Sequence, residues 1–189
     1  MIVGLVLAAG LARRMGAAKL LLPLDGKPLL RWSVEGLSPH VDRVTVVVPP
    51  DDGPLRAALA GLDVDFVTNP RPQDGQSTSI AAGVKALGTD VDAVVIALGD
   101  QPRVPATLVR DLLALFQASG KPIAAPVFRG VQGTPVVFAA TVFDELRALD
   151  GDAGARAVVR KDPARVARLA LDTDMPLDVD TPEDYARLV

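Results

Sequence analysis

Short valine-rich apolar runs alternate along the chain with segments whose apolar residues recur at helical spacing. The runs that predict strands are Ile2–Ala8, Arg43–Val48, Val64–Val67, Ala93–Leu98, Ile123–Ala125, Pro135–Phe138 and Val166–Leu171. The segments that predict helices are Pro28–Leu37, Leu55–Leu62, Ser77–Leu87, Ala106–Ser119, Val142–Leu149 and Ala153–Lys161, with a short last helix at Asp184–Val189. Continuously apolar strands separated by helices are typical of a parallel sheet that is covered on both faces. The sequence therefore predicts an α/β fold with a mainly parallel sheet.

Length and composition narrow the class of protein. The 189 residues favour a single domain, 1–189, with one substantial core. Hydrophobic residues make up 49% and charged residues 23% of the chain, which is typical of a globular protein and excludes a disordered one. A net charge of −3 requires no broad basic face, so nucleic acid is not an expected partner. The chain has no cysteine, which excludes disulfides, thiolate metal sites and cysteine nucleophiles.

The sequence also bears on location. No apolar run approaches the roughly 18 residues that a membrane span needs, so no membrane partner is expected. The first charges after the N-terminal apolar run are Arg13 and Arg14. A signal peptide carries its positive charges before the apolar run rather than after it. A cytoplasmic protein is therefore the expectation.

The first expected strand runs into a glycine-rich, cationic loop, "LAAGLARRMGAAK", at residues 7–19. Ligands bind at the carboxyl ends of strands in open α/β sheets, so this loop is a candidate binding segment. Gly10 and Gly16 allow the backbone to approach a ligand closely, and Arg14 and Lys19 add positive charge. The combination suits a triphosphate, although it matches neither a Walker A loop nor a dinucleotide fingerprint. The alternative is a surface loop whose cations are only solvated.

Three carboxylates are candidates for a metal site. Asp100 follows the fourth expected strand, and an oxygen ligand near a phosphate-binding loop suits Mg²⁺. The alternative is that Asp100 caps the next turn or helix. Asp178 could supply a second carboxylate, with Asp180 the weaker candidate. The same stretch also reads as a helix start, with Thr181 as the N-cap and Pro182 at the first helical position, and both interpretations can hold together.

These motifs together resemble the MobA-like NTP transferases, and within that family most closely the molybdenum cofactor cytidylyltransferases. The similarity begins with "LAAGLARRMGAAK" and continues through "LLLPLDGKPLL", "GQSTSIAAG", "ALGDQPRV", "GTPVVF", "LDGDAGAR" and "DVDTPEDYARL". It covers nearly the whole chain in order. The resemblance implies a three-layer, Rossmann-like fold of the glycosyltransferase-A type. It also implies Mg²⁺-dependent transfer of a nucleoside monophosphate from an NTP to a phosphorylated acceptor, with release of pyrophosphate.

The resemblance assigns roles to particular residues. Arg14, Lys19 and Asp100 are implied to be catalytic, with Arg14 and Lys19 on the triphosphate and Lys19 facing the α-phosphate. Asp100 matches the family's Mg²⁺ ligand, and Asp178 stands where related enzymes supply a second one. The nucleotide-binding set comprises Leu7, Ala8, Ala9, Gly10, Arg14, Lys19, Gly75, Ser77 and Ser79. Thr134 and Arg156 are implied to lie on the acceptor side.

Several of these assignments have alternatives. Ser77 and Ser79 could instead cap the helix that they open, and Arg156 could be a solvated residue on its helix. Two positions also depart from the family pattern. Ala12 stands where serine or glycine is usual, and Thr134 stands where histidine or asparagine is usual.

The substrate expectation rests on a few positions. Ala9, in place of a glycine that is frequent in guanylyltransferases, leaves less room for a purine, and "DGQSTSIAAG" is similar to the cytidylyltransferases. CTP and a molybdopterin-type small molecule are therefore the expected substrates, with a molybdenum hydroxylase as a possible recipient of the product. The alternatives are GTP or another phosphorylated acceptor, or a nucleotide-binding maturation factor for a molybdenum hydroxylase that does not turn over.

Overall fold

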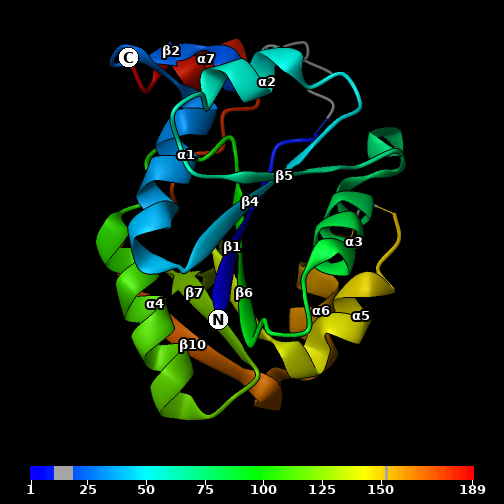
Figure 1. The fold of residues 1–189 in the computed structure, drawn as a ribbon. Helices are drawn as coiled ribbons and strands as arrows, with labels where there is room; N and C mark the ends of the chain where they lie inside the picture. The colour runs from blue at the N-terminus through cyan, green and yellow to red at the C-terminus, as the bar shows by residue number, and fades with distance from the viewer. Residues whose placement is uncertain (11–18, 152) are drawn as a thin grey trace.

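The computed structural model describes residues 1–10, 19–151 and 153–189, which form an α/β sandwich around one large sheet (Figure 1). The sheet has eight strands, and its main path runs in the order β10-β7-β9-β6-β1-β4-β5, with β8 paired to β7. Its strands are β1 (Ile2–Leu7), β4 (Arg43–Val48), β5 (Asp65–Thr68), β6 (Ala93–Leu98), β7 (Ile123–Phe128), β8 (Val131–Gln132), β9 (Val136–Ala139) and β10 (Val166–Leu171). A separate hairpin is formed by β2 (Pro23–Leu24) and β3 (Lys27–Pro28).

The sheet is mainly parallel, as the sequence predicts. The pairs β1–β4, β1–β6, β4–β5 and β10–β7 are all parallel, whereas β9 lies antiparallel between β6 and β7. The predicted bounds of β4, β6 and β10 agree with the structure residue for residue.

Helices cover both faces of the sheet. They are α1 (Leu29–Leu37), α2 (Gly53–Ala58), α3 (Gln76–Ala86), α4 (Ala106–Ser119), α5 (Phe143–Arg147), α6 (Arg156–Lys161) and α7 (Pro182–Ala186). Helices α3, α5 and α6 pack on one face, and α1, α2 and α4 pack on the other (Figure 1). The three-layer, Rossmann-like architecture is therefore confirmed.

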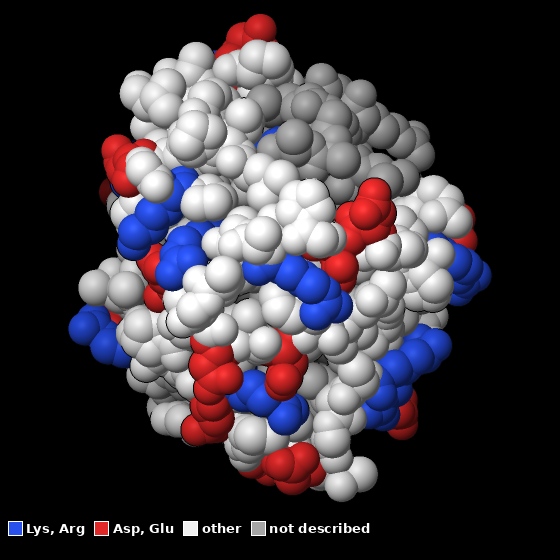
Figure 2. All heavy atoms as spheres, turned by 45° about the horizontal axis from the view of Figure 1, so that its top comes forward, with Lys and Arg blue, Asp and Glu red and all other residues white. Residues whose placement is uncertain are grey.

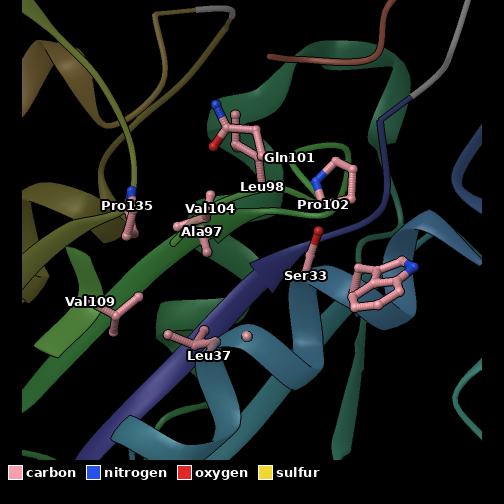
Figure 3. Close-up of a pocket in the computed structure, with 11 residues that line it drawn as sticks. Ser33, Leu37, Ala97, Leu98, Gln101, Pro102, Val104, Val109 and Pro135 are labelled. Carbon is pink, nitrogen blue, oxygen red and sulfur yellow. The ribbon is translucent and has the colours of Figure 1, made fainter. Parts of the chain in front are cut away.

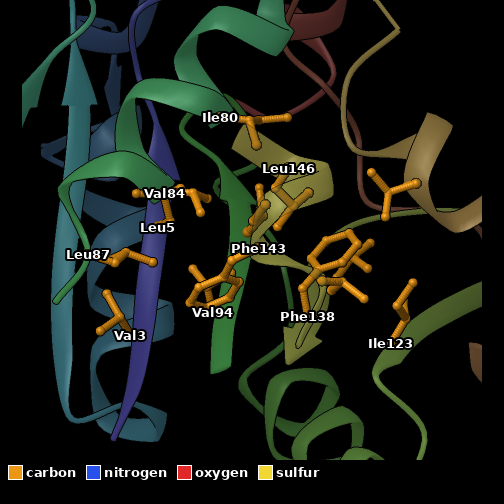
Figure 4. Packing of buried hydrophobic residues seen from close by; sticks show 14 of the residues in the cluster. Val3, Leu5, Ile80, Val84, Leu87, Val94, Ile123, Phe138, Phe143 and Leu146 are labelled. Carbon is orange, nitrogen blue, oxygen red and sulfur yellow. The ribbon is translucent and has the colours of Figure 1, made fainter. Parts of the chain in front are cut away.

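Each face has its own apolar core, because successive side chains of β1 point to opposite sides of the sheet. Val3 and Leu5 belong to one cluster of buried residues with Ile80 of α3 and Phe143 of α5 (Figure 4). On the opposite face, Val6 belongs to the cluster that α1, α2 and α4 cover. A central strand buried on both faces explains why its sequence is apolar without alternation.

The strand register brings the ends of β1 and β6 together. Leu7 pairs with Leu98, and the Gly99 amide donates to the Leu7 carbonyl at 3.0 Å. A Cβ atom at position 99 would lie 3.0 Å from that carbonyl oxygen, so a glycine is needed for this close approach. Residues 8–10 and 99–101 therefore leave the sheet side by side at its carboxyl edge.

Charged side chains of both signs are interspersed on the visible described surface (Figure 2). One local network links α5 to the end of α6 and to the residue before β10. In it, Glu145 accepts hydrogen bonds from Arg165 Nη1 at 2.5 Å and from Lys161 Nζ at 2.9 Å. Among the helices that the structure describes, none has the length and apolarity to cross a bilayer.

This network predicts a pH-dependent stability. The hydrogen bonds from Arg165, and then those from Lys161, lower the pKa of Glu145 from its ordinary 4.5 to about 2. A lowered pKa in the folded state stabilises the protein above pH 4.5, and this contribution is lost as the pH falls toward about 2. We expect Glu145→Gln to reduce the free energy of unfolding at pH 7 by about 1 kcal/mol, since the group is partly exposed. Urea unfolding of both proteins at several pH values measures this, and an equal difference at pH 7 and pH 3 would contradict it.

Candidate active site

A buried ammonium group lies between two carboxylates at the carboxyl edge of the sheet. Lys19 begins the short 3₁₀ turn Lys19–Leu21, and its side chain is 10% exposed. Its Nζ lies 2.7 Å from Asp100 Oδ2 and 2.9 Å from Asp180 Oδ1. Burial lowers the pKa of Lys19, but the charges and hydrogen bonds of Asp100 and Asp180 outweigh it and raise that pKa above its ordinary value. Lys19 is therefore a fixed cation at neutral pH.

A third carboxylate, Asp178, lies on the same side of the site. Its Oδ1 accepts a hydrogen bond from Gln101 Nε2 at 2.5 Å. The next residue, Val179, is fully buried, and its amide donates to the backbone carbonyl of Asp100 at 3.1 Å. Burial, followed by the negative charge of Asp100, raises the pKa of Asp178 above its ordinary value. Asp178 and Asp100 thus lie close enough to repel one another, and a cation at this point would relieve the repulsion.

The segment that carries Asp178 and Asp180 is fixed at its far end by a capped helix. Thr181 Oγ1 accepts from the Asp184 amide at 3.2 Å, and Asp184 Oδ2 accepts from the Thr181 amide at 3.0 Å. These reciprocal bonds form a capping box, with Pro182 in the first turn of α7. The helix start predicted at Thr181 and Pro182 is therefore confirmed. The cap does not use the side chains of Asp178 and Asp180, and a metal site at these carboxylates stays a prediction.

The three carboxylates border an open pocket of about 300 Å³. Its apolar wall comes from the strand ends and α3, through Leu7, Ile80, Ile96, Leu98 and Val136. Its polar lining comes from Asp100, Asp178 and Asp180 and from Gln76, Gln132, Thr134 and Arg156. A concave site with an apolar wall and a few polar groups is typical of a small-molecule site.

The two residues predicted on the acceptor side both line this pocket. Thr134 precedes β9 and is half-buried, and its hydroxyl donates to Gln101 Oε1 at 2.5 Å. Arg156 begins α6 and is exposed to solvent as well as to the pocket. The structure therefore brings Thr134 and Arg156 into one cavity with Asp100 and Asp178, although they come from distant parts of the chain.

The serines predicted to bind nucleotide lie inside the protein. Ser77 is fully buried and its Oγ accepts from the Gly154 amide at 3.0 Å. Ser79 is 4% exposed and its Oγ accepts from Asn69 Nδ2 at 3.0 Å. Neither serine caps α3, whose N-cap is Gly75 with φ at +102°. Their hydroxyls therefore hold neighbouring loops against α3.

The first loop is described only at its two ends. Leu7, Ala8 and Ala9 are buried in the strand end, with exposures of 8%, 3% and 1%, and Gly10 is exposed. Arg14, and with it positions 11–18, lies outside the described residues. Of the two cations of this loop that are predicted to be catalytic, Arg14 and Lys19, the structure describes Lys19. Its side chain lies against Asp100.

The donor set fits Mg²⁺. Among the described residues, hydrogen bonds engage one oxygen of Asp100, to Lys19, and one oxygen of Asp178, to Gln101. The second oxygen of each carboxylate has no such bond within that part of the chain. No group of three or more metal-binding side chains occurs among the described residues. Mg²⁺ commonly takes only one or two carboxylates and completes its octahedron with phosphate oxygens and water, so the pair Asp100 and Asp178 suits it when a triphosphate is bound.

Comparison with known proteins decides the family. Residues 4–167 match the family described as the MobA-like NTP transferase domain. The chain belongs to this family. The proteins that resemble it include the purine catabolism protein PucB of Bacillus subtilis, 32% identical over 97% of this chain and 94% of that protein. A molybdenum cofactor guanylyltransferase of Cereibacter sphaeroides is 31% identical over 97% of this chain and 93% of its own.

A solved structure supports the same assignment. The crystal structure of Rv0371c from Mycobacterium tuberculosis superposes on this MobA-like chain with a TM-score of 0.87, at 31% identity, covering 99% of this chain and 96% of that one. A second structure of Rv0371c is a complex with manganese, with a TM-score of 0.83 at 30% identity, and it covers the same 99% and 96%. A structural relative of the chain has thus been solved in complex with a divalent cation.

Two buried polar residues at this edge of the sheet escape sequence reasoning. Gln101 is 2% exposed and bonds both Asp178 and Thr134. Asn69 is 1% exposed and ties the end of β5 to α3 through the side chains of Thr78 and Ser79. The only available signal was position, because each follows the end of a strand at the ligand-binding edge of the sheet.

Proposed function

We propose that the protein transfers CMP from CTP to the phosphate of a molybdopterin-type acceptor, with release of pyrophosphate. The observation that carries the proposal is the buried Lys19 ammonium, which is held against Asp100, a residue that lines one pocket with Asp178 and Thr134. This arrangement combines a fixed cation, a pair of metal-binding carboxylates and a cavity for a second substrate. The product would then be delivered to a molybdenum hydroxylase.

The reaction needs no protein base. An oxygen of the acceptor phosphate attacks the α-phosphorus of the nucleotide, the bond from that phosphorus to the bridging α–β oxygen breaks, and pyrophosphate leaves with the electron pair. A phosphate monoester has its second pKa at about 6, so the nucleophile is already ionised at neutral pH. The single histidine, His40, lies in the turn Ser38–His40 and does not line the pocket. A pocket without a histidine is consistent with this mechanism.

Catalysis then depends on bringing two anions together. Lys19 donates to the non-bridging oxygens of the α-phosphate, where negative charge accumulates in the transition state. Asp100 and Asp178 hold the divalent ion, which, when bound, neutralises charge on the triphosphate. Arg156 and Thr134 orient the acceptor from the other wall of the pocket. Arg14 is proposed to bind the leaving pyrophosphate.

GTP is the second candidate nucleotide. A guanylyltransferase is among the relatives that match nearly the whole chain, which favours GTP. Ala9 is proposed to favour CTP, because an alanine at this strand end leaves less room for a purine than a glycine would. The two substrates share every phosphate contact, so only the base distinguishes them.

A panel of nucleotides tests the proposal. The full-length protein is incubated with Mg²⁺, molybdopterin and each of CTP, GTP, ATP and UTP in turn, and pyrophosphate is measured. We expect release with CTP and little with the other three. Release with GTP alone would overturn the base assignment. Tight CTP binding with no release of pyrophosphate, whether this acceptor or a sugar phosphate is present, would instead favour a maturation factor without turnover.

A further inference from the structure

We propose that Gln101 is a positioning residue that fixes the Asp178 carboxylate for metal binding and ties it to Thr134 on the acceptor wall. The proposal deepens the proposed function and rests on it for the roles of Asp178 and Thr134. The hydrogen-bond chain itself is a feature of the structure: Thr134 Oγ1 to Gln101 Oε1 at 2.5 Å, and Gln101 Nε2 to Asp178 Oδ1 at 2.5 Å.

The chemistry of the partners fixes the orientation of the Gln101 amide. An ionised carboxylate only accepts hydrogen bonds, so the NH₂ group of Gln101 must face Asp178. The amide oxygen then faces Thr134, whose hydroxyl donates to it. Because its hydrogen is used in this way, the Thr134 hydroxyl offers only lone pairs to the pocket. A substrate group beside Thr134 is therefore expected to be an N–H or O–H donor.

The surroundings of Gln101 restrict its amide to these partners. The residue is 2% exposed. It lines a small cavity of about 20 Å³, whose mostly apolar lining includes Leu37 and Val109. Figure 3 shows the amide pointing away from Leu37 and Val109. A buried amide without partners is costly, so the bonds to Asp178 and Thr134 stabilise one rotamer of Gln101.

Asp178 depends on this support more than Asp100 does. Asp100 lies two residues after the end of β6, and Lys19 holds one of its oxygens. Asp178 lies in the stretch 172–181, which has neither helix nor strand, and among the described residues its carboxylate accepts one hydrogen bond, from Gln101. The bond from Gln101 holds one oxygen of Asp178 and leaves the second oxygen without a hydrogen bond within the described part of the chain. That second oxygen is therefore available to a metal ion in the pocket that Asp178 lines.

Metal affinity without turnover tests the proposal. Binding of Mn²⁺ to the full-length protein, measured from the electron paramagnetic resonance signal of free Mn²⁺, is compared between the unmodified chain and Gln101→Met. Methionine preserves the length and removes both hydrogen bonds. Loss of a residue that orients a metal ligand typically weakens metal binding by about tenfold or more, and we expect an increase in Kd of that size. We also expect kcat to fall more than the KM for CTP rises.

A matched control distinguishes loss of Asp178 positioning from a general destabilisation of the turn that carries Gln101. Ser33 Oγ donates to the Gly99 carbonyl at 3.1 Å, so Ser33→Ala removes a buried hydrogen bond from the same turn without touching Asp178 or Thr134. We expect Ser33→Ala to leave the Kd for Mn²⁺ within twofold. In an Asp178→Asn background, Gln101→Met should have little further effect, because the two residues act through one interaction.

The outcomes are distinguishable. A Gln101→Met protein that binds Mn²⁺ as the unmodified chain does, or a Ser33→Ala protein weakened as much, would overturn the proposal. If Gln101→Met does not fold, Thr134→Val replaces it, with a smaller increase in Kd expected and an unchanged Kd contradicting the proposal. A chain that binds Mn²⁺ in this pattern but releases no pyrophosphate would overturn the proposed function and leave the role of Gln101 standing.

Discussion

Replacing Lys19 by methionine is expected to lower kcat for pyrophosphate release by about 10³-fold, a loss of roughly 4 kcal/mol of transition-state stabilisation. Methionine keeps the length of the side chain and removes the charge. The KM for CTP should rise by much less, because the interaction with the α-phosphate strengthens toward the transition state. Steady-state pyrophosphate release at saturating CTP and acceptor measures both parameters.

The same substitution should tighten metal binding. In the structure the Lys19 ammonium donates a hydrogen bond to Asp100 Oδ2, so it competes with any second cation for that carboxylate. Its removal leaves Asp100 and Asp178 without their nearest positive charge, and the Kd for Mn²⁺ should fall. Turnover and metal affinity therefore move in opposite directions. A kcat within tenfold of the original, or weaker Mn²⁺ binding, would contradict the role given to Lys19.

Replacing Asp100 by asparagine is expected to have the other large effect, a loss of pyrophosphate release by about 10³-fold. The amide keeps the shape of the side chain but loses the charge that a divalent cation requires. Binding of Mn²⁺ should weaken together with activity, in contrast to the Lys19 variant. The fold should survive, because Asp180 still bonds Lys19 at 2.9 Å.

A control with the same change of charge accompanies this experiment. Asp172→Asn removes one carboxylate whose side chain is 99% exposed and lies outside the pocket. It should leave both activity and Mn²⁺ binding unchanged. Full activity in Asp100→Asn, or a comparable loss in Asp172→Asn, would remove the basis for a metal site at the end of β6.

The fold could be predicted where local pattern and tertiary packing agree. Strand β6 and helix α4 have the predicted bounds because their apolar residues face cores on the expected sides. The helix expected at Leu55–Leu62 instead spans Gly53–Ala58, since it starts around Pro54 and Gly61 adopts φ of +82° beyond its end. Strand β7 extends past the predicted Ala125 to Phe128. Its last residues pair with β8 and β10, and pairing with distant strands leaves no local signal.

The site could be predicted in part. Lys19 and Asp100 each follow a strand of one parallel sheet, so their proximity follows from topology. The contact of Asp180 with Lys19 joins residues 161 positions apart and depends on how the C-terminal segment crosses the sheet edge, which no sequence pattern specifies. Gln101 has no role that its sequence neighbours predict. A buried amide acquires a role from its partners, and those partners are known only once the chain is folded.

Phosphorus-31 nuclear magnetic resonance of one reaction mixture tests the central claim most directly. The unmodified protein is incubated with CTP, Mg²⁺ and molybdopterin, and the spectrum is followed with time. The account predicts that the acceptor's monoester signal disappears, while signals of a new phosphoanhydride and of pyrophosphate grow in equal amounts. Unchanged CTP, or its conversion to free CMP with the acceptor phosphate intact, would contradict transfer to that acceptor.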